Sequence, residues 1–460
     1  MQKASKVRPG YGIVEGVIWQ QLLIFFFPIL LGTFFQQLYN TADAMIVGKY
    51  VGKQALAAVG GSTGNLINLI VGFFVGLASG ATVIISQFFG ARQEKDVSRT
   101  VHTAMALAIA GGLMLTALGY WLSPTLLQWM NTPEDVMGPA VTYIRIYFLG
   151  MVPSLIYNIG SGVLRAVGDS RRPLFFLIAA CMTNIVLDLL LVMGADMGVA
   201  GAAWATILSQ TVSAVLVIVV LMRSHQAYHL QWRRVRFHKD LLLRIAQIGL
   251  PAGLQSVMYS ISNVLIQSFV NNFGTDVSAA WSAWGRLDGF QWMILNAFGI
   301  SITTFVGQNF GAMKFDRVKK GVRECLVMAF AAAGLCSVTL LLFGQYFYRL
   351  FANDPVVIEK GMEILRLIAP FYVAYTCVEI LSGAMRGAGE TVVPTLFTLC
   401  GICALRLVWL LGFVARNPSI PLTMVSYPMT WAITSCLFIF YYLKGGWMKR
   451  CQEKLITRKG

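Results

Sequence analysis

Residues 161–169 read SGVLRAVGD and residues 382–390 read SGAMRGAGE, so one motif occurs twice, 221 positions apart. Further matches at or near this distance are QFFGA at 87–91 with QNFGA at 308–312, Arg145 with Arg366, Pro173 with Pro394, and Pro28 with Pro251. A distance that is kept over so much of the chain indicates an internal duplication. The sequence therefore predicts two similar halves.

Long apolar runs fill both halves. Of the 460 residues, 57% are hydrophobic and 12% are charged, which is about half the charged share of a typical soluble domain. A membrane-spanning helix needs about 20 apolar residues. Twelve segments provide them, at roughly 18–48, 54–88, 98–121, 139–162, 173–194, 198–222, 241–270, 277–309, 318–345, 359–384, 393–414 and 422–443. These numbers exclude a soluble enzyme and predict an all-α polytopic membrane protein with twelve transmembrane helices.

The number of spans in each half determines how the two halves are related in the membrane. Six spans in each half preserve orientation, so two pseudo-symmetric six-helix lobes should be related by an axis along the membrane normal. Parallel repeats of this kind occur in secondary transporters, although a duplication that is only structural remains an alternative. We predict an N-terminal lobe at 1–222, a basic linker at 223–240, a C-terminal lobe at 241–445 and a tail at 446–460.

Basic residues predict the orientation in the membrane. The net charge of +16 would suggest nucleic acid as a partner of a soluble protein, but membrane proteins collect Lys and Arg in cytoplasmic loops. If the N-terminus is inside, 27 of the 36 Lys and Arg lie in cytoplasmic segments and five in external loops. We therefore expect both termini in the cytoplasm. The basic linker should lie near anionic lipid rather than bind nucleic acid.

Several chemistries are not supported by the sequence. It contains no G-x-x-x-x-G-K-[ST] nucleotide loop and no H-E-x-x-H metal motif. The pair Cys400 and Cys403 lies in an apolar run, where ordinary buried cysteines are favoured over a metal or redox site. We therefore expect neither an enzyme nor a nucleotide-driven pump, and no cofactor beyond a coupling ion.

Four polar residues inside the spans form the main candidate site. Ionisable side chains are costly within a bilayer, so each one suggests a function. At 1.5 Å per residue, Asp43, Asn184, Asp188 and Thr206 should lie roughly 7–15 Å below the outer surface, at one depth of the N-terminal lobe. Two carboxylates there would hold a proton or, with the amide and hydroxyl oxygens, a small cation such as Na⁺. The alternative is a buried hydrogen-bonded network that only packs the lobe.

A second set of polar residues lies in the C-terminal half. Arg286, Asp288, Glu379 and Arg406 are intramembrane, and ion pairs explain them as well as substrate contacts do. Aromatic rings can hold cationic ligands over their faces. Candidate substrate contacts are Phe35, Gln36 and Tyr39 near Asp43, and Gln255, Tyr259, Asn263, Trp284 and Asp288 in the other half.

These motifs together resemble the multidrug and toxic compound extrusion (MATE) family over nearly the whole chain. The residues that carry the resemblance are NTAD at 40–43, the LRAVGD and MRGAGE pair, TNIVLDLLLVMGADMGVAGAAWAT at 183–206, RLDGF at 286–290 and TTFVGQNFGA at 303–312. The resemblance implies a bacterial cytoplasmic-membrane antiporter that exports organic, cationic compounds in exchange for H⁺ or Na⁺. Its two lobes would open alternately to each side. Members of the wider superfamily instead flip lipid-linked oligosaccharides, which is the alternative function.

The resemblance also implies roles for individual residues. Asp43, Asn184, Asp188 and Thr206 would form the cation site of the N-terminal lobe, and Pro28 would be a hinge in the first span. Some members carry a carboxylate site in the C-terminal lobe that involves the seventh span. The seventh span of this sequence has no acidic residue, which puts such a site in doubt. We expect a monomer whose partners are a small organic substrate and membrane lipid.

Overall fold

The secondary structure is helical throughout the part of the chain that the structure describes. The computed structural model describes residues 12–350 and 354–457, and no strand occurs among them. Among these described residues, eleven helices are long and apolar enough to cross a membrane: Ile18–Tyr50, Lys53–Gly90, Glu94–Trp129, Arg171–Gly194, Gly198–Arg223, Lys239–Asn271, Thr275–Gly311, Phe315–Arg349, Pro355–Ala388, Val392–Val414 and Ile420–Lys444. The bent pair Glu134–Leu149 and Met151–Ala166 makes a twelfth. The predicted fold class of twelve helices is confirmed, in the predicted order.

Packing divides the chain into two compact units. The first contains Phe27–Gly253, and the second contains Ile13–Phe26 and the chain from Leu254 onward. Helix α2 (Ile18–Tyr50) is therefore shared near Pro28, and α10 (Lys239–Asn271) is shared near Pro251. The predicted lobe boundaries remain predictions. Packing places residues 13–26, predicted for the first lobe, in the second unit, and residues 241–253, predicted for the second lobe, in the first unit.

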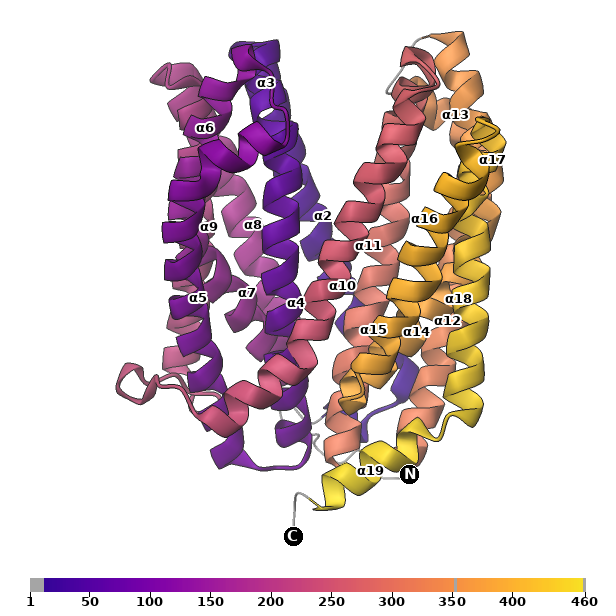
Figure 1. Ribbon diagram of the computed structural model, residues 1–460. Helices are drawn as coiled ribbons and strands as arrows, with labels where there is room; N and C mark the ends of the chain where they lie inside the picture. The colour runs from indigo at the N-terminus through magenta and orange to yellow at the C-terminus, as the bar shows by residue number, and fades with distance from the viewer. Residues whose placement is uncertain (1–11, 351–353, 458–460) are drawn as a thin grey trace. The chain divides into compact units, whose positions relative to one another are not determined.

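The first unit is built on four helices that surround an apolar core. Helices α4 (Ser62–Gly90), α5 (Glu94–Trp129), α7 (Met151–Ala166) and α9 (Gly198–Arg223) pack side by side (Figure 1). Their facing side chains include Val101, Met105, Leu155, Val163 and Val217, all nearly inaccessible to solvent. The remaining elements of this unit are α3 (Lys53–Gly60), α6 (Glu134–Leu149), α8 (Arg171–Asp188), η1 (Leu189–Gly194) and η2 (Trp232–Arg234).

The second unit is centred on α11 (Thr275–Gly311) and α14 (Tyr372–Ala388), whose backbones approach closely. A Cβ placed on Gly387 would lie 2.5 Å from the carbonyl oxygen of Thr303, so this contact requires a glycine. The other elements are α1 (Gly12–Glu15), α12 (Phe315–Arg349), α13 (Pro355–Ile368), η3 (Ala369–Phe371), α15 (Val392–Thr398), η4 (Leu399–Ala404), α16 (Leu405–Trp409), η5 (Leu410–Val414), α17 (Ile420–Met424), α18 (Ser426–Lys444) and α19 (Trp447–Thr457).

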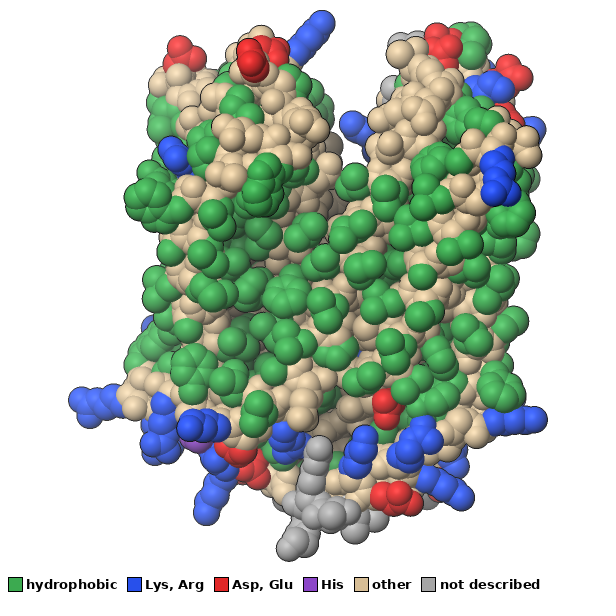
Figure 2. All heavy atoms as spheres, viewed as in Figure 1, with side chains coloured by type: hydrophobic (Ala, Val, Ile, Leu, Met, Phe, Trp, Pro, Cys, Tyr) green, Lys and Arg blue, Asp and Glu red, His purple; other side chains and the backbone are tan. Residues whose placement is uncertain are grey.

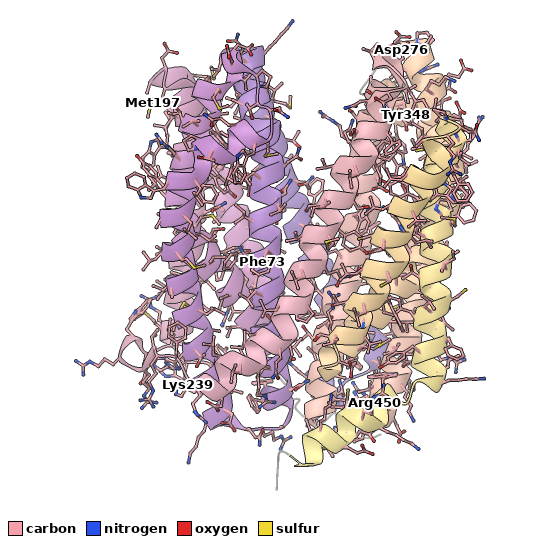
Figure 3. The ribbon with its side chains drawn as sticks, viewed as in Figure 1. Phe73, Met197, Lys239, Asp276, Tyr348 and Arg450 are labelled. Atoms are coloured by element: carbon pink, nitrogen blue, oxygen red, sulfur yellow. The ribbon has the colours of Figure 1, made fainter. Side chains whose placement is uncertain are left out.

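Glycines on α4 bring the start of α10 against it within the first unit. The sequence GxxxGxxxG at 72–80 contains Gly76, whose Cβ would lie 2.5 Å from the backbone nitrogen of Gly253. Phe73 lies at the same contact, where its carbonyl oxygen would be 2.7 Å from a Cβ on Gly253 (Figure 3). Small residues thus let two helices touch through their backbones.

The fourth span is broken, which the sequence analysis missed by treating 139–162 as one run. Helices α6 and α7 meet at Gly150 with a bend of 50°. Pro153 has no N–H to donate to the carbonyl of Leu149, so α6 ends there. Gly150 also lies against Ile207, where a Cβ would be 2.7 Å from that side chain. The bend therefore follows from one proline and one close contact.

Basic side chains gather mainly toward one end of each unit. Figure 2 shows hydrophobic side chains along the helices and Lys and Arg side chains toward one end. Lys239 marks that end in the first unit and Arg450 in the second (Figure 3). Apolar helix middles with basic residues collected toward one end are typical of a multi-pass membrane protein.

Candidate functional site

The four residues predicted as a cation site are all buried in the first unit. Asp43 on α2 is 6% exposed, Asn184 and Asp188 on α8 are 0% exposed, and Thr206 on α9 is 5% exposed. Asn184 and Asp188 lie one turn apart and so share a face of α8. Asp188 is the last residue of α8, and the π-helical turn η1 follows it directly. Such turns interrupt regular α-helix and often accompany functional sites.

Several polar atoms of this cluster have no hydrogen-bond partner among the described residues. They are Oδ1 of Asp43, both carboxylate oxygens of Asp188, and both side-chain amide atoms of Asn184. Thr206 donates its hydroxyl proton to the carbonyl of Ala202 at 3.0 Å, so the lone pairs of its oxygen stay available. Buried polar atoms are normally paired, and a cluster of unpaired oxygens is suited to a proton or a small cation.

These side chains lie near one another in the first unit. Asp188 lies close enough to Asp43 to be affected by its charge, and Tyr143 on α6 lies beside Thr206 and is affected by the charge of Asp43. Tyr39 lies beside Gln36 and interacts with Tyr147 and Asp43. Asp43, Asp188 and Thr206 are thereby joined into one cluster, with Asn184 one turn away from Asp188.

Two tyrosines of this cluster were missed by the sequence analysis, which searched for ionisable groups. Tyr143 and Tyr147 stack with ring centroids 6.2 Å apart, and Tyr147 lies beside Gln210 of α9. Their spacing of one helical turn inside a predicted span was a usable signal. Of the predicted substrate contacts in this unit, Phe35 and Tyr39 are half-buried and Gln36 is exposed.

The second unit contains a connected set of aromatic rings on four helices. Trp281 and Trp284 of α11 stack at 4.3 Å, and Tyr427 of α18 lies 5.7 Å from Trp284. The set continues through Trp431, Tyr372, Tyr375, Trp292 and Tyr259. Of the predicted contacts, Trp284 and Tyr259 belong to this set, whereas Gln255 is half-buried and Asn263 is exposed.

Acidic and basic side chains accompany these rings. Arg406 is 2% exposed, lies 4.0 Å above the ring of Tyr427 and donates to Thr430 at 3.1 Å. Asp288 is 8% exposed, lies beside Tyr372 and Trp292 and interacts with the charge of Arg406. Arg406 and Asp288 therefore share one environment.

Glu379 belongs to a different pairing. It accepts a hydrogen bond from Tyr375 at 3.5 Å and forms an ion pair with Arg386 at 3.6 Å. Arg386 lies seven residues later on the same face of α14, a partner that the sequence analysis did not name. Arg286 is exposed on α11. An ion pair thus accounts for Glu379.

No group of three or more His, Cys, Asp or Glu that could hold a metal ion occurs within residues 12–350 and 354–457. A Na⁺ ion would instead depend on the carboxylates of Asp43 and Asp188 with the oxygens of Asn184 and Thr206, a donor set that suits a hard cation.

Comparison with known proteins decides the family. The family model MatE matches residues 28–190 and 251–410. The chain belongs to the MATE family. The predicted resemblance is confirmed, and the two matched segments correspond to the two halves of the duplication.

Relatives match this MATE chain over nearly its whole length. The probable multidrug resistance protein YpnP of Bacillus subtilis is 30% identical, over 98% of this chain and 100% of its own. The probable multidrug resistance protein YoeA of the same organism is 28% identical, over 95% and 96%. A solved structure described as the outward-facing conformation of a multidrug resistance MATE family transporter matches with a TM-score of 0.89 at 21% identity, over 97% of this chain and 100% of that chain. This structural match confirms the two-lobed fold.

Proposed function

We propose that this MATE protein is a secondary active antiporter that exports organic, cationic compounds in exchange for H⁺ or Na⁺. The observation that carries the proposal is the buried pair Asp43 and Asp188, which interact electrostatically and have carboxylate oxygens without hydrogen-bond partners among the described residues. The names of its relatives, multidrug resistance proteins, support organic compounds as the cargo. They give no support to the flippase alternative.

In this proposal the coupling ion is bound in the first unit. Two carboxylates in a low-dielectric site repel each other, so the pair is stable with a proton on one of them or a cation between them. Asn184 and Thr206 add neutral oxygen ligands. The ion and the substrate stabilise different conformations, and each therefore shifts the transporter toward the state that it prefers. Pro28, near which α2 passes from one unit to the other, is the proposed hinge.

Substrate contacts come from both units in this proposal. Phe35, Gln36 and Tyr39 contribute from α2. Gln255, Tyr259, Asn263, Trp284 and Asp288 contribute from α10 and α11, where ring faces suit a cation. We further propose a monomer surrounded by lipid in the bacterial cytoplasmic membrane, with both termini in the cytoplasm.

Uptake of a fluorescent organic cation into proteoliposomes tests the function. With Na⁺ matched on both sides, an imposed pH gradient should drive uptake if H⁺ is the coupling ion. A Na⁺ gradient at matched pH should drive it if Na⁺ is. Protein-free liposomes under the same gradients give the background. Uptake at background level under both gradients, with a panel of organic cations, would contradict the proposal.

A further inference from the structure

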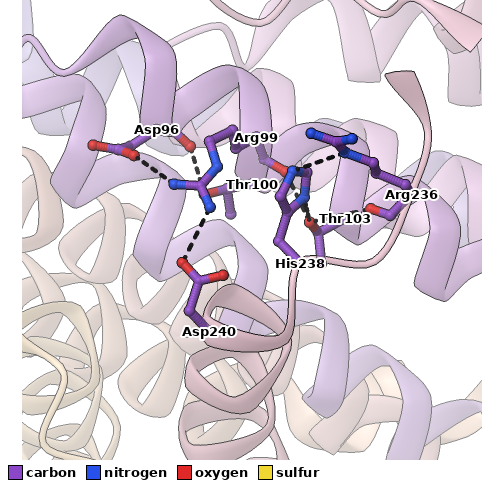
Figure 4. A network of polar contacts seen from close by, with 7 residues as sticks. All are labelled: Asp96, Arg99, Thr100, Thr103, Arg236, His238 and Asp240. Atoms are coloured by element: carbon purple, nitrogen blue, oxygen red, sulfur yellow. Dashed lines mark hydrogen bonds and ion pairs between the residues drawn. The ribbon is translucent and has the colours of Figure 1, made fainter. Parts of the chain in front are cut away.

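The segment between α9 and α10, residues 224–238, is fastened to the start of α5 within the first unit (Figure 4). We call this segment the linker. The backbone N–H of Gln231 donates to Nε2 of His102 at 3.1 Å, and His238 contacts Thr103 at 2.8 Å. Tyr228 and Leu230 are buried in the core of the unit. The linker is therefore docked by apolar side chains and by two histidines.

His102 must be neutral in this arrangement. Its Nδ1 lies 2.6 Å from the carbonyl oxygen of Ser98, which can only accept, so Nδ1 carries a proton. Its Nε2 faces the N–H of Gln231, which can only donate, so Nε2 must offer a lone pair. A second proton on the ring would put two N–H groups face to face and break the bond to the linker.

His238 is held neutral by the same logic. The guanidinium Nε–H of Arg236 donates to its Nε2 at 3.3 Å, and an arginine N–H cannot accept. The hydroxyl of Thr103 donates to the carbonyl of Arg99 at 2.9 Å, so Thr103 accepts from Nδ1–H of His238. With one proton on each imidazole, every hydrogen bond around the ring is made. A second proton, on Nε2, would have no acceptor.

We propose that the linker is a proton-sensitive clasp, docked on α5 while His102 and His238 are neutral and released when they take up protons. Helix α10 begins at Lys239, directly after the clasp, and its first part packs in the same unit. Release of the clasp would therefore free the start of α10. Nothing in this inference depends on the transported compound or the coupling ion.

Most of the charged groups around the two rings disfavour a second proton on them. His102 faces Arg234 and His229, whereas His238 faces Arg99, Arg236, Asp240 and His102. Asp240 acts in the opposite sense on His238, but its carboxylate forms an ion pair with Arg99 at 3.4 Å. Asp96 also pairs with Arg99, at 3.5 Å. Burial first, and then the positive charges of Arg99 and Arg236, lower the pKa of His238 below its ordinary value.

The sign of the pH dependence follows from this. An undocked histidine has a pKa of about 6.5. Docking requires the neutral rings, so it is fully stable above that pH and is lost as the pH falls. At pH 5.5 each histidine can lower the equilibrium constant for docking by up to about tenfold, and the two together by up to about a hundredfold.

The second unit provides an internal reference without histidine. There the segment around α1 is held by Asn309, Lys314 and Arg317, which donate to the carbonyls of Ile13 and Val14 at 3.3, 3.1 and 3.0 Å. This segment is held without a histidine, the side chain whose ordinary pKa lies between pH 5.5 and 8. Docking of this segment should be insensitive to pH over that range.

Hydrogen exchange of the full-length protein in lipid nanodiscs tests the clasp. We expect protection of peptides covering 226–238 to fall between pH 8 and pH 5.5, after correction for intrinsic exchange, while peptides covering 12–26 keep theirs. Protection of the linker that is constant over this range, or that falls only in parallel with the reference peptides, would overturn the proposal.

Variants assign the effect to the two histidines. In the double variant His102→Asn with His238→Asn, hydrogen-exchange protection of the linker should not change with pH, whatever its level. His225→Asn is the matched control, because His225 is exposed in the same linker, and it should behave as the wild type. A double variant that keeps the wild-type pH response would overturn the assignment. If the double variant does not fold, the wild-type comparison of the two segments still decides.

Discussion

Replacing Asp43 by Asn should reduce ion-driven export to the level of protein-free liposomes while leaving the fold intact. Asp43 is buried, and its Oδ1 has no hydrogen-bond partner within the described residues. Asparagine keeps the shape of the side chain but cannot hold a proton or neutralise a cation. Coupling energies of about 1–3 kcal/mol correspond to about 5- to 150-fold in affinity, so loss of the ion's contribution should be large. The measurement is gradient-driven uptake of a fluorescent organic cation.

Two further variants give this prediction its contrast. Asp188→Asn should have the same effect, because Asp188 interacts with Asp43 and its two oxygens likewise have no hydrogen-bond partner in the described part of the chain. Asp276→Asn makes the same chemical change at an exposed position at the start of α11 (Figure 3) and should transport like the wild type. Wild-type uptake by Asp43→Asn would show that the cluster only packs the lobe.

The sequence was sufficient to propose the carboxylate pair but not its surroundings. Asp43 and Asp188 are conspicuous because charged residues are rare and costly inside a membrane. Tyr143 and Tyr147 carry no such mark, since a tyrosine in an apolar run is common at interfaces and in cores. The position of Tyr143 beside Asp43 and Thr206, and of Tyr147 beside Gln210, depends on how α6 turns at Gly150, which is a tertiary property. Arg386 was missed for a related reason, because it lies near the end of its helix and only the fold shows its contact with Glu379.

Span number was predictable because each span repeats the same apolar length. The sequence did not predict which unit the ends of α2 and α10 pack in. Ile13–Phe26 packs in the second unit although it precedes the first unit in sequence. Pro28 and Pro251 marked the places near which this exchange occurs, but a proline indicates only a weak point in a helix. The π-helical turns η1, η4 and η5 were also unforeseen, because one extra residue per turn leaves no signature in an apolar run.

Gly76→Ala should destabilise the protein strongly, although alanine is the better helix former. The new Cβ would lie 2.5, 2.6 and 2.7 Å from the nitrogen and Cα of Gly253 and the carbonyl carbon of Ala252. All three are backbone atoms of α10, which cannot turn aside as a side chain can. Overpacking of this kind costs about 1–3 kcal/mol, and more where the backbone must move. Thermal unfolding of the purified protein measures the effect.

Gly334→Ala on α12 separates crowding from helix propensity. A Cβ there meets no atom of the described residues within 4 Å, so the same substitution should stabilise its helix by about 0.5–1 kcal/mol. The two variants are therefore expected to shift the melting temperature in opposite directions. Gly253→Ala, which would press against the carbonyl oxygen of Phe73 at 2.7 Å from the other side of the contact, should resemble Gly76→Ala. Equal shifts for Gly76→Ala and Gly334→Ala would mean that α4 and the start of α10 are not in backbone contact, and α10 would then have no firm attachment to the first unit there.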